Sequence, residues 1–287
     1  MPTIIATTPH RVSLAGGATD IPEFYKSHGY GATVGIAIEP LSNVTIMPRS
    51  WDDRGVMFRY SKTVEAANTE ELDQADPAQF RLKVAGRHVG VQSGFELTSQ
   101  SGTSYKKGGS GLGSSSSFAA SLLLSLYVFG GERKPTGTLD ARQLSELRYW
   151  LAEKTYYFER ELLGQHVGKQ DQYTAVFGGI NHFRFNSDDG VEVTRIPLSI
   201  GNRIALSGQL HLFYTGVHRD AETLLRGLAG SAADNAQALL RMRSLADETR
   251  DRLMRGDIDS IGEMLDRGWQ LKKTLDPNIS NERIDRA

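Results

Sequence analysis

The chain has 287 residues, of which 39% are hydrophobic and 23% charged, a length and composition that suit a soluble globular protein of one large or two ordinary domains. A formal net charge of −1 excludes bulk attraction to nucleic acid or to an anionic membrane, so any anion must be bound by local groups. Cysteine is absent, no apolar run has membrane-spanning length and the N-terminus lacks a signal-peptide pattern, so we expect a cytoplasmic protein without disulfides or thiolate metal sites.

Strand patterns fill much of the first fifty residues, where β-branched residues alternate with small or polar ones. They predict strands over Thr3–Thr8, Val12–Leu14, Ala32–Ile38 and Asn43–Pro48. Residues 50–80 are polar and mixed in charge, which indicates an insertion with a strand near Val56–Tyr60. A helix over Phe80–Val91 and a short strand over Phe95–Ser99 are expected to follow.

The segment Pro9–Asp20 carries the first candidate site residues. Arg11 follows a proline at a strand end and can present a rigid guanidinium to anionic groups. The turn glycines Gly16 and Gly17 bring the backbone close to whatever binds beside Thr19 and Asp20, and a carboxylate there can accept hydrogen bonds from sugar hydroxyls. Alternatively, Asp20 caps a helix over Ile21–Ser27. The residues alone leave both interpretations open.

Gly108–Phe118 reads GGSGLGSSSSF and runs directly into the leucines of a buried helix that we expect to end at Gly130–Gly131. Such a loop turns unpaired N–H groups outward beside the positive end of the helix dipole, an arrangement that binds phosphate. The serines can cap the helix or offer hydroxyls to phosphate or to Mg²⁺. A flexible linker is the alternative, although a linker rarely runs unbroken into an apolar helix. No Gly-Lys-Ser/Thr closes a Walker motif, and the glycine spacing fits the Rossmann fingerprint poorly.

The remaining pattern alternates helices with short strands. After a cap at Thr138–Asp140, helices are expected over Leu139–Leu163, from Ala221 to about Arg255 and over Ile258–Leu275, with strands over Ile180–Phe185, Val191–Leu198 and His211–Tyr214. The fold class is therefore α+β, a mixed sheet covered by helices. Gly, Asn and Asp turns cluster between about 185 and 205, which divides the chain into domains at 1–190 and 191–287.

Gly168–Gln172, reading GKQDQ, lies in a short loop between helices. Asp171 beside Lys169 is a candidate for drawing a proton from a hydroxyl, because the lysine would keep the carboxylate ionised. The alternative is a solvent-exposed ion pair, worth about 0–1 kcal/mol. Four aromatic residues nearby could form the interface of a homodimer or pack into the core; they are Tyr149, Trp150, Tyr156 and Tyr157.

In this order, the three segments resemble the GHMP small-molecule kinases. Gly111–Ser117 is similar to the signature loop of that family, while Pro9–Asp20, Gly168–Gln172 and the tail at 271–285 resemble its D-glycero-D-manno-heptose 7-phosphate kinase branch. The resemblance spans nearly the whole chain. Departures are His10, where leucine is common, and Ala18, where the branch often has glycine. The third, glycine-rich motif of the family would follow Ala287, so domain 191–287 is expected to lack that segment.

The resemblance implies a two-domain GHMP-like fold and an ATP- and Mg²⁺-dependent kinase acting on the anomeric hydroxyl of a heptose 7-phosphate, for nucleotide-activated heptose synthesis. Another sugar acceptor, or a non-catalytic sugar or nucleotide sensor, is the alternative. Asp171 would orient or deprotonate the hydroxyl, with Lys169 and Arg11 offsetting charge. Ser115 and Glu159 would hold Mg²⁺, with Glu161 as a competitor.

The same resemblance assigns the binding residues. The ATP phosphates would lie over the loop residues Gly108, Gly109, Ser110, Gly111, Leu112, Gly113, Ser114, Ser115 and Ser116. The sugar would be bound by Arg11, Gly16, Gly17, Thr19, Asp20 and Asp171. The expected partners are thus a small-molecule sugar phosphate and ATP, with neither nucleic acid nor membrane.

Overall fold

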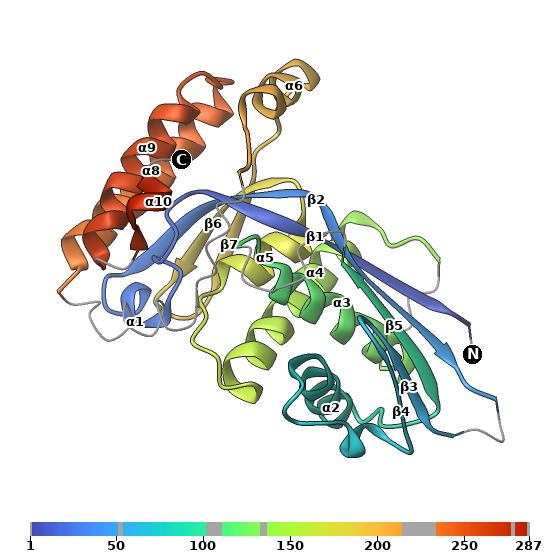
Figure 1. Ribbon diagram of the computed structural model, residues 1–287. Helices are drawn as coiled ribbons and strands as arrows, with labels where there is room; N and C mark the ends of the chain where they lie inside the picture. Colours follow the sequence, from blue (N-terminus) through green and yellow to red (C-terminus); the bar gives the residue numbers. More distant parts are fainter. Residues whose placement is uncertain are drawn as a thin grey trace. The chain divides into compact units, whose positions relative to one another are not determined.

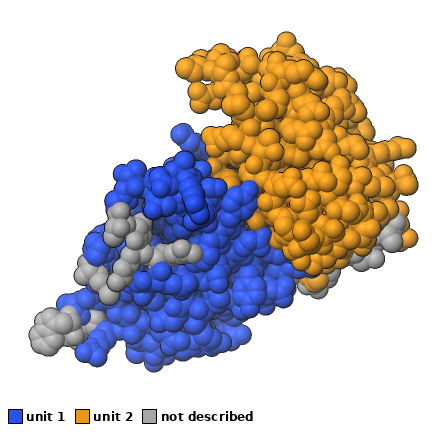
Figure 2. Space-filling model, turned by 180° about the vertical axis from the view of Figure 1, so that it is seen from behind, with its two compact units in different colours: residues 1–10, 38–108, 113–165 blue, residues 11–37, 109–112, 166–287 orange. Residues whose placement is uncertain are grey.

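The computed structural model describes residues 2–50, 54–101, 111–132, 137–213, 234–276 and 279–285 (Figure 1). Two compact units comprise residues 1–10, 38–108 and 113–165 (unit 1) and residues 11–37, 109–112 and 166–287 (unit 2), as coloured in Figure 2. Segments of the two units alternate along the sequence, because β1 (Ile4–Ala15) and β2 (Tyr30–Pro48) each have residues in both units. This division differs from the consecutive domains expected from the sequence. The turns near residue 190 form a hairpin within unit 2 instead.

Unit 1 contains a sheet built on the second half of β2. β5 (Phe95–Ser101) pairs antiparallel with β2, Ser42 facing Ser101 and Pro48 facing Phe95. β3 (Val56–Arg59) runs parallel to β5, and β4 (Thr63–Ala66) closes the edge as an antiparallel neighbour of β3. The two strands expected within residues 32–48 form the single strand β2.

The helices of unit 1 are α2 (Pro77–Val89), α3 (Ser114–Phe129) and α4 (Ala141–Tyr157), with one 3₁₀ turn, η1 (Thr69–Glu71). α3 contacts both α2 and α4, and the side chains of Leu122, Leu123 and Leu126 are fully buried. α4 begins at the expected cap, because Asp140 and Gln143 form a reciprocal capping box. It continues into a five-residue π-helical turn, η2 (Phe158–Leu162), which also contacts α3.

Small hydroxylated residues hold the start of α3 against β1. Thr8 Oγ1 donates to the carbonyl of Ser117 at 2.6 Å and lies 2.7 Å from Ser121 Oγ. Ser121 Oγ in turn donates to the carbonyl of Ser42 on β2 at 3.1 Å. Serine side chains are short enough for helix and strand to approach closely while satisfying their buried hydroxyls. The first turn of α3 is therefore fixed by the core of unit 1.

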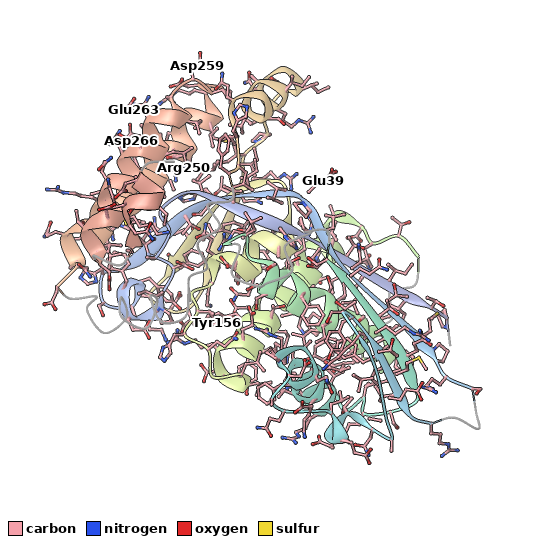
Figure 3. The ribbon with its side chains drawn as sticks, in the orientation of Figure 1. Glu39, Tyr156, Arg250, Asp259, Glu263 and Asp266 are labelled. Carbon is pink, nitrogen blue, oxygen red and sulfur yellow. The ribbon has the colours of Figure 1, made fainter. Side chains whose placement is uncertain are left out.

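Unit 2 contains the first half of β2, which pairs antiparallel with β6 (Ile180–Asn186), and β6 pairs in turn with β7 (Val191–Arg195). α5 (Gln170–Phe177) and α8 (Ala236–Met254) both contact β6, and α9 (Ile261–Leu275) packs on α8. α1 (Pro22–Tyr25), α6 (Ile200–Gln209) and α10 (Glu282–Asp285) are the other helices described in this unit. The core joins Leu14, Val34 and Ile180 to Leu245 and Met264. The outer face of α9 is charged, with Glu263 and Asp266 exposed (Figure 3).

A second apolar cluster of unit 2 packs the turn after β1 against the tail. Ala18, Ile21 and Phe24 contact Leu275 and Ile279, which belong to the tail segment resembling the heptose kinase branch. Ala18 adopts the left-handed conformation, with φ +77°, which costs a residue with a Cβ about 1–2 kcal/mol. Its methyl group is buried in this cluster, so packing offsets part of that cost.

Two expectations for the second half of the chain need correction. The strand predicted at His211–Tyr214 is absent from residues 211–213, which form irregular backbone, and Tyr214 lies outside the described residues. The helix expected from Ala221 to about Arg255 is not continuous: α8 runs from Ala236 to Met254 and follows a turn at residues 234–235, while residues 214–233 lie outside the described part. Within the described ranges, no helix is both long and apolar enough to cross a membrane.

Candidate functional site

The described end of the glycine-rich loop leads directly into α3. Gly111 and Gly113 adopt left-handed backbone conformations, with φ +73° and +64°, which glycine reaches without steric cost. Gly113 is the N-cap residue and no side chain caps the helix, so the expectation of a serine cap is wrong. Ser114, Ser115 and Ser116 form the first helical turn instead. The other predicted loop residues, Gly108, Gly109 and Ser110, lie outside the described residues.

Within unit 1, the first turn of α3 meets the π-helical turn η2 at Glu159. Ser115 Oγ donates to Glu159 Oε1 at 2.9 Å, and Ser116 Oγ donates to Glu159 Oε2 at 2.5 Å. The glutamate is only 1% exposed, whereas the side chain of Glu161 is 59% exposed and lies 4.0 Å from Arg160. The π-helical geometry is rare, and single π-helical turns such as this one occur frequently at functional sites. Of the two glutamates considered as partners of Ser115, Glu159 is the one in contact.

This cluster has the chemistry of a magnesium site that is completed by a substrate. Mg²⁺ prefers hard oxygen ligands and is usually bound by one or two protein groups together with phosphate oxygens and water. The hydroxyl of Ser115 and the carboxylate of Glu159 are such groups, so these residues fit the ion. Among the residues described, no group of three or more His, Asp or Glu side chains could hold a metal by itself.

Within unit 2, Arg11 joins Asp171 to the glycine-rich loop. Its guanidinium donates to both carboxylate oxygens of Asp171 at 2.7 Å, a bidentate pair in which the two side chains are 16% and 31% exposed. A further guanidinium N–H donates to the carbonyl of Gly111 at 2.5 Å, and the Arg11 backbone N–H donates to the carbonyl of Leu112 at 2.9 Å. A fork of this kind fixes both the charge and the orientation of the carboxylate.

Asp20 does not cap α1, whose N-cap residue is Ile21 and which has no side-chain cap. Its Oδ2 accepts a hydrogen bond from the Gln170 backbone N–H at 2.9 Å, so the segments around Asp20 and Asp171 lie together in unit 2. Burial raises the pKa of the Asp20 carboxyl, and the Gln170 N–H opposes that shift. A Cβ at Gly168 would overlap the Asp20 carboxylate, so that glycine is required by this approach.

The other predicted sugar-binding residues shape the turn that carries Asp20. Gly16 has φ +80°, and a Cβ there would overlap the carbonyl of Ala32. The buried Thr19 hydroxyl lies 2.8 Å from the carbonyl oxygens of both Gly16 and Ala32, to either of which it can donate its proton, and it accepts from the Ala32 N–H at 3.0 Å. A Cβ at Gly17 would fit in ordinary contact, 3.4 Å from Ser13 Oγ. Thr19 and Gly16 thus hold the turn in place.

Lys169 is buried, with 2% of its surface exposed, and its ammonium group donates to the backbone carbonyl of Asp189 at 2.9 Å. The cation that forms an ion pair with Asp171 is Arg11. Sequence spacing could not reveal this pairing, because the partners lie 160 positions apart.

Sequence reasoning also missed Arg81 of α2, whose guanidinium lies 3.4 Å from Glu159 Oε1.

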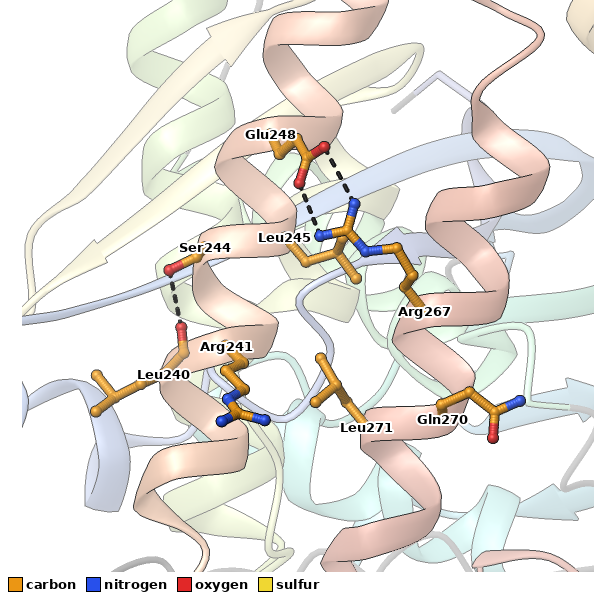
Figure 4. A pocket seen from close by; sticks show the side chains of 8 residues that line it. All are labelled: Leu240, Arg241, Ser244, Leu245, Glu248, Arg267, Gln270 and Leu271. Atoms are coloured by element: carbon orange, nitrogen blue, oxygen red, sulfur yellow. Dashed lines mark hydrogen bonds and ion pairs between the residues drawn. The ribbon is translucent and has the colours of Figure 1, made fainter.

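The described surface has hollows in both units. In unit 1, a hollow of about 630 Å³ is lined by Phe58, Tyr60 and Phe118 together with residues of β5. In unit 2, a groove of about 500 Å³ between α8 and α9 is crossed by the ion pair of Glu248 with Arg267 (Figure 4). The second hollow contains none of the predicted site residues.

Residues 79–179 match the family described as the GHMP kinases N terminal domain. Over 297 residues, covering 100% of this chain and 82% of the relative, the chain is 29% identical to the D-glycero-alpha-D-manno-heptose 7-phosphate kinase of Campylobacter jejuni. It is also 24% identical to the bifunctional fucokinase/GDP-fucose pyrophosphorylase of Arabidopsis thaliana, over 97% of this chain and 27% of that protein.

Among solved structures, a D-glycero-D-manno-heptose 1-phosphate kinase from Bacteroides thetaiotaomicron superposes with a TM-score of 0.75 at 22% identity, covering 95% of this chain and 80% of that one. The likeness in structure concerns the fold, and it confirms the expected GHMP-kinase-like α+β architecture. Together with the family match, these similarities confirm the prediction of an ATP-dependent sugar kinase. They do not specify the acceptor.

Proposed function

We propose that this chain transfers the γ-phosphoryl group of ATP to the anomeric hydroxyl of a heptose 7-phosphate. The match to the GHMP kinases N terminal domain and the GHMP-kinase-like fold support the proposal. The observation that carries the proposal is the bidentate pair of Arg11 with Asp171, anchored on the carbonyls of Gly111 and Leu112. A carboxylate tied in this way to a phosphate-binding loop suits a group that faces the acceptor hydroxyl.

The donor half of the site belongs to the glycine-rich loop and α3. Backbone N–H groups at the start of α3, with the helix dipole behind them, would bind the polyphosphate. The hollow beside Phe58, Tyr60 and Phe118 offers flat apolar surfaces for the adenine base. Ser115 and Glu159 would hold Mg²⁺, which when bound neutralises charge on the phosphates.

The acceptor half belongs to the turn at residues 16–20 and the start of α5. Asp171 would accept the proton of the attacking hydroxyl, and Arg11 keeps its carboxylate oriented and paired. Asp20, fixed by the Gln170 N–H and by the close approach of Gly168, would accept hydrogen bonds from sugar hydroxyls. Because phosphoryl transfer is accelerated chiefly by positioning and electrostatics, this small set of groups is sufficient in principle.

The test is ADP release with Mg²⁺ and ATP across a panel of sugars and sugar phosphates. The expected outcome is the highest kcat/KM for a heptose 7-phosphate, with a product that carries a second, anomeric phosphate. The likeness to a plant fucokinase makes L-fucose the most informative competing acceptor. A clear preference for L-fucose would replace the proposed acceptor, and binding of sugar and ATP without turnover would support a sensor instead.

A further inference from the structure

Arg81 is a cation of unit 1 that lies beside the candidate magnesium ligand Glu159. It projects from α2, its side chain is 14% exposed, and it lies 3.4 Å from Oε1 of the almost fully buried Glu159. A second N–H of its guanidinium is 3.4 Å from Gln165 Oε1. The arginine therefore lies at the same carboxylate that Ser115 and Ser116 contact at the start of α3.

Among the described residues, other arginines also lie 3.4–4.0 Å from a carboxylate, but both partners of those pairs are more exposed than Arg81 and Glu159. The buried or bidentate pairs are shorter. Arg11 holds Asp171 through two bonds of 2.7 Å, and Arg87, on the same helix as Arg81, holds Glu70 at 2.9 and 2.5 Å. Strong charge-assisted pairs are short and bidentate. Both contacts of Arg81 are long, and the shorter bonds to Glu159 come from the two serines.

The loose contact has a physical reason. A carboxylate that is 1% exposed is costly to leave unpaired, and Arg81 is a cation that the described structure places beside Glu159. When Glu159 instead faces a divalent cation, Arg81 is no longer needed for charge balance. Its planar fork of N–H donors then suits the phosphate oxygens of a nucleotide bound at the start of α3.

We propose that Arg81 binds the nucleotide phosphates and that Glu159 competes with them for its guanidinium, so that this contact would be strongest when Glu159 holds Mg²⁺. The proposal rests on the proposed kinase function and deepens it, because it identifies a phosphate-binding residue on α2. The competing explanation is purely structural, with Arg81 acting only to keep Glu159 in place.

Nucleotide binding measured in the absence of metal distinguishes the two explanations. ADP binding in EDTA is measured by titration calorimetry for the wild type, Arg81→Gln, Glu159→Gln and the double variant. Arg81→Gln should weaken ADP binding about tenfold, the loss of one charge-assisted contact, or about 1.4 kcal/mol. Glu159→Gln should strengthen it severalfold, because Arg81 is released, and the double variant should bind as weakly as Arg81→Gln.

Arg87→Gln is the matched control, since it removes an exposed arginine from a carboxylate pair on the same helix and should leave ADP binding unchanged. If Arg81→Gln binds metal-free ADP as the wild type does, or if Glu159→Gln also weakens binding, the proposal is wrong. Should Arg81→Gln fail to fold, the double variant decides the matter, because its buried carboxylate charge is gone: ADP binding as strong as that of Glu159→Gln would show a purely structural role for Arg81. A wild-type protein that binds no nucleotide, with or without Mg²⁺, would overturn the kinase function itself.

Discussion

Replacing Asp171 by Asn tests the acceptor half of the site with the smallest change in shape. The variant keeps the size of the side chain and one oxygen that can accept from Arg11, but it loses the negative charge and the proton acceptor. Arg11 keeps its bonds to Gly111 and Leu112, so the guanidinium should stay in place. The perturbation is therefore confined to the carboxylate.

The expected magnitude follows from two separate contributions. Loss of a positioned general base lowers kcat by about 10²–10⁴-fold, or roughly 3–5 kcal/mol in activation free energy. Loss of one charge-assisted bond would lower the free energy of unfolding by about 1.5–3 kcal/mol if the pair were fully buried. With Asp171 31% exposed, solvent screening reduces that figure to about 1 kcal/mol.

The assay combines steady-state ADP release with ATP binding and urea unfolding. Asp251→Asn is the matched control, because Asp251 accepts from Arg250 Nε at 2.8 Å in a more exposed pair of unit 2. Asp171→Asn should lose kcat while binding ATP normally, and the control should keep its activity. Near-wild-type turnover of Asp171→Asn with intact ATP binding would refute the assignment of Asp171 as the base or orienting group.

Three further predictions concern the neighbouring residues. Ser115→Ala should raise the Mg²⁺ concentration for half-maximal rate by about tenfold, whereas Ser125→Ala on the same helix should not; an unchanged Mg²⁺ dependence would contradict the ligand assignment. Gly168→Ala should raise the KM for the acceptor more than that for ATP, because the added Cβ overlaps the Asp20 carboxylate, and it should destabilise the fold by about 1–3 kcal/mol; equal effects on both KM values would argue against a sugar-binding role for Asp20. Because burial raises the pKa of Asp20, its stabilising contribution is present below the unfolded pKa of about 3.9 and is lost as pH rises through the folded pKa. As the pH rises from about 4 to 7, the free energy of unfolding measured by urea titration should therefore fall less for Asp20→Asn, which stays neutral, than for the wild type. Identical pH profiles would be inconsistent with the raised pKa.

Local sequence signals predicted the structure correctly where it depends on residues within a single segment. The run of leucines after the glycine-rich loop predicted a buried helix, and the helix ends at Gly130 as expected. Asp140 and Gln143 stand at the spacing of a capping box and form one. These features depend on neighbours within one or two turns, which the sequence displays directly.

Other features depend on contacts between distant segments, and the sequence could not specify them. The sequence predicted two strands, over Ala32–Ile38 and Asn43–Pro48, yet β2 runs through both ranges as one strand. The sequence was equally consistent with Asp20 as the cap of a helix. In the structure Asp20 does not cap α1 and instead accepts a hydrogen bond from the Gln170 N–H, 150 positions away. The pairing of Asp171 with Arg11 rather than with the adjacent lysine is likewise a long-range choice. Arg81 stood in an ordinary amphipathic helix with no local signal of its contact with Glu159.

Phosphoryl transfer to the anomeric hydroxyl is tested most directly by ³¹P NMR of the reaction with ATP, Mg²⁺ and a heptose 7-phosphate. We expect a new glycosyl phosphate resonance coupled to the anomeric proton, growing in step with ADP and absent from the Asp171→Asn reaction. ADP formed without a sugar-bound phosphate resonance, or an equal yield of product from Asp171→Asn, would contradict it.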